Sequence, residues 1–415
     1  MRMLRGRRAE AAVRGLEERG TRDLARVEKQ VGRIVADVRK NGDRALHRYA
    51  EKWDSLAKKQ ALRVSEAELQ FAWNGVSESF KQALKTAAAN IRQYCEWQKP
   101  QPWRNALGPG VQVGQVVRPL ESVGCYVPGG RYPLPSTMLM TVIPAQVAGV
   151  EQIRVVSPRP APETLATAFF LGLREMYRIG GAQAIAALAY GTATIRRVDK
   201  IVGPGNLFVT AAKKLVAFDC GIDFLAGPTE VVIVSERGNG SFIAADLVAQ
   251  AEHDPDALAI FITSAEALAA DVALQVKTAA ALNETAKAAL KKNGAILLAA
   301  SHGQALEFAN RIAAEHITVH EEDLPHVRNA GSIFIGDYSP QAAGDYAAGP
   351  NHVLPTGVVA RCRAGLSVHD FVKTISVQQI SRDGLDRIAG AVITLAEAEG
   401  LKAHAESIRV RSANA

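Results

Sequence analysis

The feature that most constrains the fold is a series of short apolar runs separated by stretches with helical periodicity. The runs are residues 122–127, 152–157 and 199–202, and then 230–235, 257–263, 295–299, 316–319 and 332–335. Brief buried runs bounded by turn residues, with helices between them, are typical of parallel sheets covered by helices on both faces. Because the runs fall into two series, the sequence predicts two related α/β domains.

The segments around these runs are expected to be helical or to form a small tail. Residues up to about 105 contain long charged amphipathic runs such as 78–91, which predict helices. Further helices are expected over 138–148, interrupted by Pro144, and over 182–190. From about residue 367 the chain changes character, with a strand-like run at 374–380 and a helix from 385 to about 399.

Composition places the chain among ordinary globular proteins. With 415 residues, 48% hydrophobic and 22% charged, it is long enough for two or more domains with sizeable cores. No apolar stretch is long enough to span a membrane. The basic N-terminus, residues 1–8, lacks the apolar core of a secretory signal, and acidic residues follow it quickly, so we expect an exposed helix there. The net charge of +7 is scattered rather than gathered in a stripe with aromatics, which argues against nucleic acid.

The four cysteines do not form a recognisable metal or disulfide pattern. Cys95, Cys125, Cys220 and Cys362 include no CxxC pair, and none lies beside a histidine. They are expected to be reduced thiols of a cytoplasmic protein. Cys125 precedes Tyr126 at the end of a predicted strand, where burial is favoured over a nucleophilic role.

Gln250 and His253 are candidate metal ligands. They follow residues 241–249, which predict an amphipathic helix. Residues three apart share one helix face, so an amide oxygen and an imidazole nitrogen would project together from the last turn. Such donors can hold half of a hard or borderline divalent metal site. For an isolated pair of this kind, the alternative is a polar helix end at the surface.

The histidines are unevenly distributed along the chain. Of the nine, only His47 precedes residue 250, and several later ones lie among acids or turns. These are His316 beside Glu315, His352 near Asp345, and His404 five residues after Glu399. This grouping indicates one site, although a surface pair is the alternative for Glu315 and His316. The others are interpreted as surface or satisfied core residues: His302, His320, His326 and His369.

Glycine-rich turns mark the positions where a ligand is expected. Parallel sheets bind ligands at the carboxyl ends of their strands, and glycine lets the backbone approach a ligand closely. The turns that we assign to such ends are 128–130, 180–183, 203–206 and 227–230. No GxGxxG opens a helix after a first strand, so each turn alone is a weak signal. These residues together indicate a metal-dependent α/β enzyme, with nucleotide binding left open.

Three long segments resemble the L-histidinol dehydrogenase family. They are Gly-Pro-Gly-Asn at 203–206 followed by GIDFLAGPTE at 221–230, then DLVAQAEHDP at 246–255, and GDYAAGPNHVLPT at 344–356. The resemblance runs from about residue 25 to 410 with the motifs in order. It implies two incomplete Rossmann-like domains: a first domain of residues 21–125 and 229–366 with the metal and catalytic pair, and an NAD-binding domain at 126–228. It also implies an N-terminal helical segment at 1–20 and a dimerisation tail at 367–415.

The same resemblance implies a zinc- and NAD-dependent oxidation of L-histidinol to L-histidine through a bound aldehyde. The zinc ligands would be Gln250, His253, Asp345 and His404. His316 would be the base and Glu315 would activate water. The substrate contacts would be these six residues together with Thr229, His352 and Glu399, and the NAD contacts would be Tyr126, Gln183 and Asn206. The family's last ligand comes from the partner subunit, so His404 and Glu399 would complete a neighbour's site in a homodimer.

The sequence departs from the family's usual residues at two positions near the expected site, and two other functions remain as alternatives. Thr229 stands where serine is usual in the family, and Ala314 stands where proline commonly precedes the Glu-His pair. Neither removes a catalytic group. Mn²⁺ or Co²⁺ would also suit these ligands. The alternatives are a paralogous dehydrogenase acting on another small polyol or amino alcohol, and a catalytically silent metal- or anion-binding protein.

Overall fold

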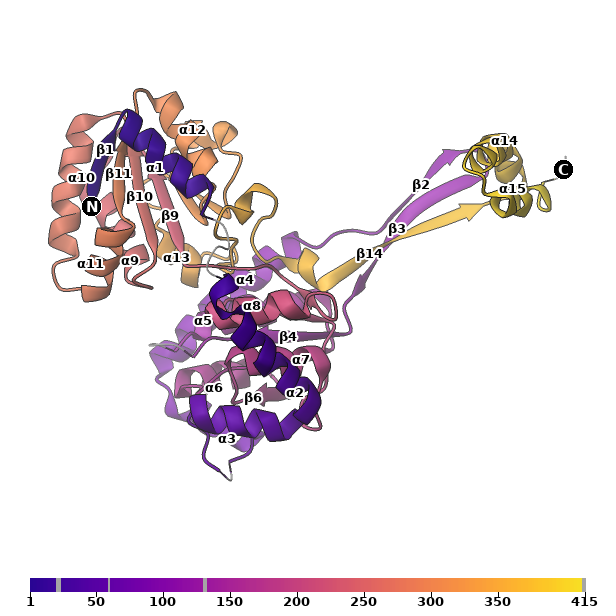
Figure 1. Cartoon of the computed structure of the whole chain (residues 1–415), viewed down its shortest axis with the longest axis horizontal. Coiled ribbons are helices and arrows are strands. Elements are labelled where there is room, and N and C mark those ends of the chain that lie inside the picture. Colours follow the sequence, from indigo (N-terminus) through magenta and orange to yellow (C-terminus); the bar gives the residue numbers. More distant parts are fainter. Residues whose placement is uncertain (20–23, 59, 130–132, 413–415) are drawn as a thin grey trace.

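The computed structural model describes residues 1–19, 24–58, 60–129 and 133–412. Two α/β bodies, each built on a parallel sheet, lie side by side, and a long arm extends from them to one side (Figure 1). The arm carries the C-terminal part of the chain at its far end. The predicted α/β class with parallel sheets is confirmed.

The first body is built on a six-stranded sheet in which all the strands are parallel. In spatial order the strands are β1 (Arg2–Arg5), β11 (Ala295–Leu298), β10 (Leu258–Thr263), β9 (Glu230–Val234), β12 (His316–Val319) and β13 (Ser332–Ile335). One face is covered by α1 (Arg7–Glu17) and α12 (His302–Ile312). The other is covered by α9 (Gly240–Ala251), α10 (Glu266–Ala279) and α11 (Glu284–Lys292).

The second body is built on a five-stranded parallel sheet. Its order is β6 (Glu175–Tyr177), β5 (Gln152–Val156), β4 (Ser122–Tyr126), β7 (Lys200–Val202) and β8 (Gly221–Ile222). The connecting helices are α5 (Pro135–Ala148), α6 (Pro162–Phe170), α7 (Gly181–Tyr190) and α8 (Leu207–Val216). In both sheets the first strand of the series is central, the next two lie on one side and the last two on the other. This shared order is that of a Rossmann sheet without its last strand, as expected for related, incomplete domains.

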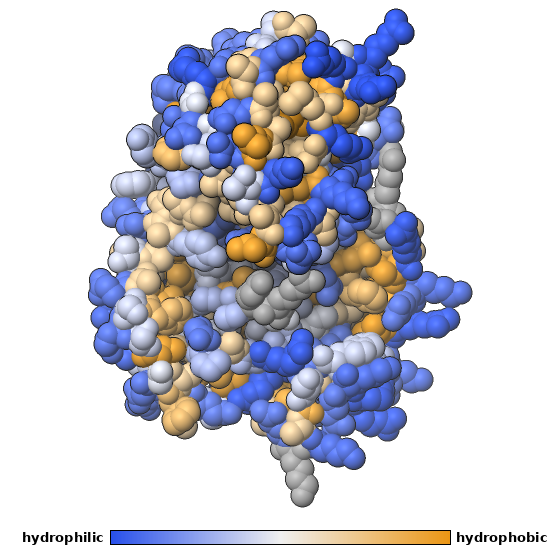
Figure 2. Space-filling view, turned by 90° about the vertical axis from the view of Figure 1, so that its left-hand side faces the viewer, coloured by the Kyte–Doolittle hydropathy of each residue, from blue (hydrophilic) through white to orange (hydrophobic). Residues whose placement is uncertain are grey.

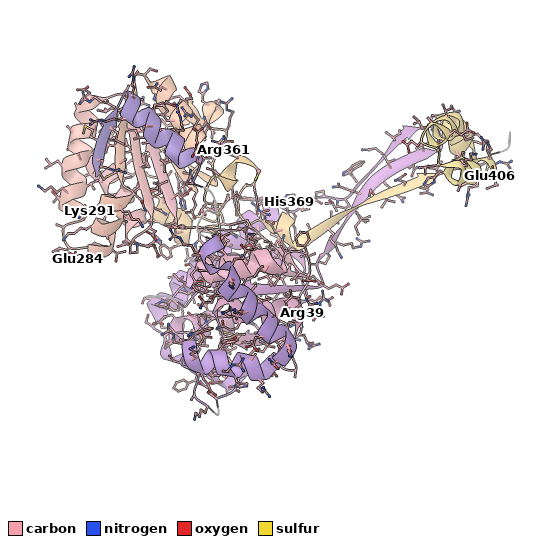
Figure 3. All side chains as sticks on the ribbon, viewed as in Figure 1. Arg39, Glu284, Lys291, Arg361, His369 and Glu406 are labelled. Atoms are coloured by element: carbon pink, nitrogen blue, oxygen red, sulfur yellow. The ribbon has the colours of Figure 1, made fainter. Side chains whose placement is uncertain are left out.

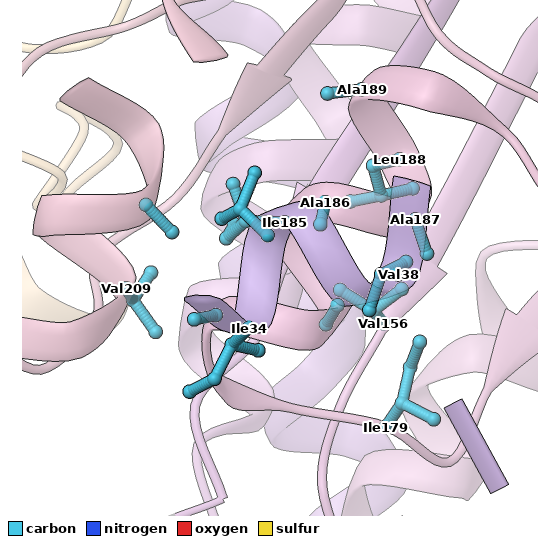
Figure 4. Packing of buried hydrophobic residues seen from close by; sticks show 14 of the residues in the cluster. Ile34, Val38, Val156, Ile179, Ile185, Ala186, Ala187, Leu188, Ala189 and Val209 are labelled. Atoms are coloured by element: carbon cyan, nitrogen blue, oxygen red, sulfur yellow. The ribbon is translucent and has the colours of Figure 1, made fainter. Parts of the chain in front are cut away.

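The cores form because successive residues of each strand face opposite sides of the sheet. In β5, Val155 packs on the side of α5, whereas Val156 packs on the side of α7 and the long helix α2 (Leu24–Trp53). Figure 4 shows this second cluster, in which Ile34 and Val38 of α2 meet the apolar side chains of α7. A strand buried on both faces reads as a continuous apolar run, which is why these strands were predictable from the sequence.

The packing of the N-terminal helices differs from the domain boundaries expected from the sequence. Residues 21–125 were expected to join residues 229–366, but α2, α3 (Glu66–Gly75) and α4 (Glu78–Trp97) pack on the second body, α2 on α7 and α8, α3 on α6, and α4 on α5. Leu24 and Leu46 share a cluster with Ile185, for example. An amphipathic stripe predicts that a helix is covered but not by which partner.

Within the predicted N-terminal segment, residues 1–19 differ from a purely helical segment. β1 pairs in parallel with β11 at the edge of the six-stranded sheet, and of these described residues only α1 is helical. The sequence Arg-Met-Leu-Arg has no alternation long enough to indicate a strand, so the pairing depends on the exposed edge of β11.

The arm is an antiparallel sheet that joins the tail to a hairpin from the middle of the chain. β14 (Val372–Ile380) pairs with β3 (Val111–Pro119), which pairs with β2 (Trp103–Gly108). Two helices, α14 (Arg382–Ala398) and α15 (Lys402–Arg409), pack on each other at its end. The tail strand and helix agree with the prediction, but the hairpin 103–119 belongs with the tail and not with the first domain.

In the part of the chain that the structure describes, no helix is both long and apolar enough to cross a bilayer. On the face shown in Figure 2, hydrophilic side chains are spread over both bodies with hydrophobic ones between them.

Candidate active site

Glu315 and His316 lie where β12 begins, both buried, with their side chains fixed by the start of the neighbouring strand β9. The backbone N–H of Glu230 donates to Glu315 Oε2 at 2.9 Å, and the Thr229 hydroxyl donates to the same oxygen at 2.5 Å. His316 Nδ1 donates to the Glu230 carbonyl oxygen at 3.0 Å. One strand start therefore positions both members of the pair, which leaves Nε2 of His316 to face the site.

The location of this pair at the sheet corrects one expectation. The turn 227–230 was assigned to the carboxyl end of a strand, but it leads into the amino end of β9, beside the amino end of β12. The turn is part of the segment that passes from β8 in one body to β9 in the other. Gly227 N–H donates to the Thr356 hydroxyl, which fixes the crossing segment to the loop that follows Asp345.

Burial and mutual charge set the protonation of the pair. Burial raises the pKa of the Glu315 carboxyl to about 7, because the charged form loses its hydration. For His316, burial alone would lower the pKa, but the nearby carboxylates of Glu315 and Asp345 outweigh it, so the pKa is raised. Asp345 Oδ1 lies 3.8 Å from His316 Nε2, an atom that is buried without a hydrogen-bond partner in the structure.

The candidate metal ligands come from α9 and α13 (Gln341–Tyr346). Gln250 lies in the last turn of α9 and is buried, and its Nε2 donates to Thr229 Oγ1, so Oε1 is the amide atom that can face a metal. His253 lies just beyond the helix rather than in its last turn, and it is exposed. Its Nδ1 donates to Ala249 O at 3.0 Å, which leaves the lone pair of the unprotonated Nε2 available to bind a metal ion. Asp345 lies near His253, His316 and His352, and although burial would raise its pKa, these histidines lower it.

The donor set of a single chain is incomplete as a metal site. Across the parts of the chain that the structure describes, no three His, Cys, Asp or Glu side chains are grouped closely enough to hold an ion. Of the expected ligands, Gln250, His253 and Asp345 offer an amide, an imidazole and a carboxylate from α9, the residues just beyond it, and α13. The orphaned Nε2 of His316 beside these groups indicates a polar ligand space at the same place.

His352 connects this group to the second body. Its Nδ1 donates to Asp345 O at 2.6 Å, and its Nε2 lies 3.3 Å from the hydroxyl of Thr137, in the first turn of α5. Burial lowers the pKa of His352, which favours a neutral ring. The contact with Thr137 was not predicted, because nothing in the sequence around Thr137 distinguishes it from a core residue.

The residues expected to contact NAD lie at the carboxyl ends of the five-stranded sheet. Tyr126 ends β4, the central strand, and its hydroxyl accepts from Gly181 N at 3.0 Å. Gln183 is buried in the first turn of α7. Asn206 caps α8 by accepting from the N–H groups of Phe208 and Val209, which leaves its Nδ2 for a ligand. The carboxyl end of a central strand is where doubly wound sheets bind nucleotides.

Asp54 is a further residue in this region that sequence reasoning missed. It is buried, and its Oδ2 accepts from Gly180 N at 3.0 Å and from Gln183 Nε2 at 3.2 Å. Burial raises its pKa. Its position after α2 carries no motif, and it reaches the turn only because α2 packs on the five-stranded sheet.

Glu399 and His404 are not brought to the site within one chain. Glu399 caps α14, and His404 belongs to α15, so both lie at the far end of the arm. Figure 3 places His369 at the root of the arm and Glu406, two residues beyond His404, near its tip. The remaining predicted residues of the site are all positioned by the two bodies.

The cysteines and the other histidines occupy roles apart from this site. Cys125 is fully buried, which raises its pKa to about 12, and therefore it is not a nucleophile. All four cysteines are free, and only Cys362 is exposed. His302 lies between Asp323 and Glu236 at the carboxyl ends of the six-stranded sheet, and His320 contacts Ser235. Both histidine rings therefore have polar partners away from the candidate site.

The chain is similar to known proteins along nearly its whole length. The family model for histidinol dehydrogenase matches residues 17–412. The histidinol dehydrogenase of Methanothermobacter thermautotrophicus is 47% identical over 95% of this chain and 96% of its own length, and that of Geobacter metallireducens is 45% identical over 95% and 93%. The crystal structure of histidinol dehydrogenase from Elizabethkingia anophelis superposes with a TM-score of 0.89 at 36% identity, covering 93% of this chain and 92% of that one. The chain belongs to the histidinol dehydrogenase family of NAD-dependent oxidoreductases.

Proposed function

We propose that this protein oxidises L-histidinol to L-histidine in two successive steps, each reducing one NAD, through L-histidinaldehyde that stays bound. The observation that carries the proposal is a continuous hydrogen-bond chain. Gln250 donates to Thr229, and Thr229 donates to Glu315. A candidate metal ligand and a candidate catalytic carboxyl are thereby held by one hydroxyl, beside a buried imidazole whose Nε2 is unpartnered.

His316 is the proposed base. Because its Nδ1 donates to a backbone carbonyl, the ring presents Nε2 to the substrate hydroxyl. In the first step Nε2 takes the hydroxyl proton while the carbon gives its hydride to NAD. In the second step it takes a proton from the hydrated aldehyde as the second hydride leaves.

Glu315 is proposed to activate the water that hydrates the aldehyde. Its pKa of about 7 leaves the carboxylate and the acid both populated near neutral pH, which suits a group that accepts and returns a proton. The Thr229 hydroxyl and the Glu230 N–H hold Oε2. Oε1 is then the oxygen that can face water.

Gln250, His253 and Asp345, with His404 of a second copy, are proposed to hold a zinc ion. When bound there, zinc would orient the substrate by its imidazole and amino nitrogens rather than take part in the redox step. The His253 ring is already held through Nδ1, which fixes the tautomer that a metal needs. Mn²⁺ or Co²⁺ would also suit this donor set.

The remaining contacts complete the proposal. Thr229, His352 and Glu399 would contact the substrate, and Tyr126, Gln183 and Asn206 would contact NAD. Because Glu399 and His404 lie on the arm, a homodimer in which each arm reaches the other subunit's site would supply them. The protein would act in the cytoplasm, on a small molecule and without nucleic acid.

The test is NADH formation from L-histidinol by the purified protein, before and after chelation and with zinc added back. Two NADH per histidinol, lost on chelation and restored by zinc, is the expected result. Absence of turnover by a folded, zinc-loaded dimer would contradict the proposal and would favour another small amino alcohol as substrate.

A further inference from the structure

One side chain of the N-terminal segment, Arg19, reaches the strand start that holds the catalytic pair. Its Nε and Nη2 donate to the two carboxylate oxygens of Glu230 at 2.6 and 2.7 Å. The two side chains are only 16% and 5% exposed. A planar guanidinium that binds both oxygens of a carboxylate fixes direction as well as distance, which a lysine ammonium does not.

The same guanidinium also binds the turn that leads into Glu315. Nη1 donates to the carbonyl oxygens of Leu16 at 2.6 Å and Ile312 at 2.7 Å, and Nη2 lies 3.5 Å from Ala313 O. Ala313 ends α12 with φ at +50°, a conformation that costs a residue with a Cβ free energy and persists only when its surroundings enforce it. Arg19 therefore binds the carbonyls at the left-handed turn just before Glu315.

Glu230 is the residue that transmits this restraint. Its N–H binds Glu315, its carbonyl binds His316, and its carboxylate binds Arg19 and the Gly357 N–H. A buried carboxylate without a charged partner moves or takes up a proton, and either change would displace the backbone that holds both catalytic groups.

We infer that Arg19 is a positioning residue for Glu315 and His316, acting through Glu230 and through the carbonyl oxygens of the turn at residues 312–313. This inference rests on the proposed roles of Glu315 and His316. Arg19 touches neither of them directly, so its loss should lower kcat without changing the affinity for NAD, which is bound in the other body.

A second arginine offers a matched control. Arg311 also ties α1 to the body, through Glu10 and Glu17 at 2.8 Å each, but it does not contact Glu230. Arg361, which Figure 3 shows beside α1, contacts Glu17 from the other side at 3.5 Å. Loss of Arg311 should weaken the packing of α1 on the body and leave the two hydrogen bonds from Arg19 to the Glu230 carboxylate in place.

The experiment compares Arg19→Met, Arg19→Lys, Arg311→Met and Glu315→Gln in the full-length, zinc-loaded protein, with kcat, the KM for NAD and the melting temperature measured for each. Arg19→Met should lower kcat by on the order of 10- to 100-fold with an unchanged KM for NAD, because a small misplacement of reacting groups is costly. Arg19→Lys should recover part of the loss. Arg311→Met should lower the melting temperature and keep kcat.

Glu230→Gln provides an independent measure of the ion pair between Arg19 and Glu230. If Arg19 acts through Glu230, Glu230→Gln should lower kcat by a similar factor, and the double variant with Arg19→Met should be no slower than the slower single variant. Multiplied losses in the double variant would show that Arg19 acts by another route and would overturn the inference.

The outcomes separate this inference from the proposed function. If Glu315→Gln abolishes aldehyde oxidation while Arg19→Met retains kcat within about twofold, the inference is wrong and the catalytic assignment stands. If Glu315→Gln is as active as the parent, the catalytic assignment fails. If Arg19→Met does not fold, Arg19→Lys decides: a lower kcat at an unchanged melting temperature supports the inference, and an unchanged kcat overturns it.

Discussion

At the scale of single residues, one hydroxyl links the two halves of the proposed chemistry. Thr229 accepts from Gln250 and donates to Glu315, so it connects a candidate metal ligand to a candidate acid–base group. A serine would offer the same hydroxyl, which explains why threonine is acceptable here. Such a network is sensitive to the loss of any member, because the others would be left buried and unsatisfied.

His253→Ala should remove bound zinc and activity together. Loss of an outer-shell partner commonly weakens metal binding 10- to 100-fold, so loss of a ligand should weaken it by more than about 100-fold. Zinc content after dialysis and NADH formation measure the two effects. His326→Ala, at an exposed histidine away from the site, is the control. Stoichiometric zinc in His253→Ala would rule out this ligand.

Glu315→Gln should spare aldehyde formation relative to aldehyde oxidation. If Glu315 activates water, only the second step loses its general base, and the loss should be roughly 10²- to 10⁴-fold. Single-turnover measurements with histidinol and with histidinaldehyde separate the steps. Equal losses in both would show that Glu315 has a different role.

The rate of alcohol oxidation should increase as the pH rises through the pKa of His316. The neutral ring of His316 is the proposed base; burial alone would lower its pKa, but the charges of Glu315 and Asp345 raise it, so a larger fraction is protonated at neutral pH. Removal of one negative charge by Glu315→Gln should shift this increase to lower pH. A pH–rate profile of the first step in both proteins measures the shift, and a shift to higher pH would contradict this electrostatic assignment.

At the scale of elements, the turn after β7, where the proposed NAD contact Asn206 lies, is fixed by local geometry. Gly203 has φ at +114°, and a Cβ there would lie 2.2 Å from the carbonyl oxygen of Tyr126. A buried ion pair holds the turn: Lys213 Nζ donates to Gly203 O at 2.7 Å, and Gly203 N donates to Asp223 at 2.8 Å. Only glycine satisfies both the φ angle and the contact.

Gly203→Ala should destabilise the protein by about 1–3 kcal/mol and raise the KM for NAD, because the turn must move away from Tyr126. Gly336→Ala is a suitable control, since Gly336 also has a positive φ but no atom of the described residues lies within 4 Å of the position that a Cβ would take there. Denaturant unfolding and NAD titration measure the two effects. An unchanged KM for NAD would show that this turn does not contribute to NAD binding.

At the scale of the whole molecule, the arm places two proposed site residues far from the bodies of their own chain. β14 pairs with β3 along its full length, which makes the arm a continuous sheet. The proposed roles of Glu399 and His404 therefore need a second copy, whose site the arm would reach. On that proposal, the dimer would be required for activity.

Mixing His253→Ala with His404→Ala should restore activity that neither variant has alone. In a mixed dimer, one site has its own His253 and receives His404 from the other chain, so random reassembly should give about a quarter of the parent activity. NADH formation after co-refolding measures it, with each variant refolded alone as the control. No recovery would show that His404 acts within its own chain or not at all.

Much of the fold was predictable because its signals are local. The strands β4, β5, β7 and β9 to β13 read as apolar runs bounded by turns, and each of them appears within a residue or two of its expected bounds. The edge strands β1, β6 and β8 and the hairpin strands β2 and β3 were not predicted, since none of them reads as a continuous buried apolar run. Gln250, Glu315 and His316 were found by residue type and spacing, whereas Arg19, Asp54 and Thr137 were not.

The sequence by itself determined the apolar strands of the two parallel series, the amphipathic helices and the residue types of the candidate site, because periodicity and long motifs are properties of consecutive residues. Only the tertiary structure decided that α2 to α4 pack on the body of the five-stranded sheet, that β1 joins β11, and that Glu315 and His316, the proposed catalytic pair, lie at the amino ends of strands. It also decided that Arg19 meets Glu230 across the chain. These depend on which apolar faces and which charges meet, and that choice is made by packing between segments far apart in the chain.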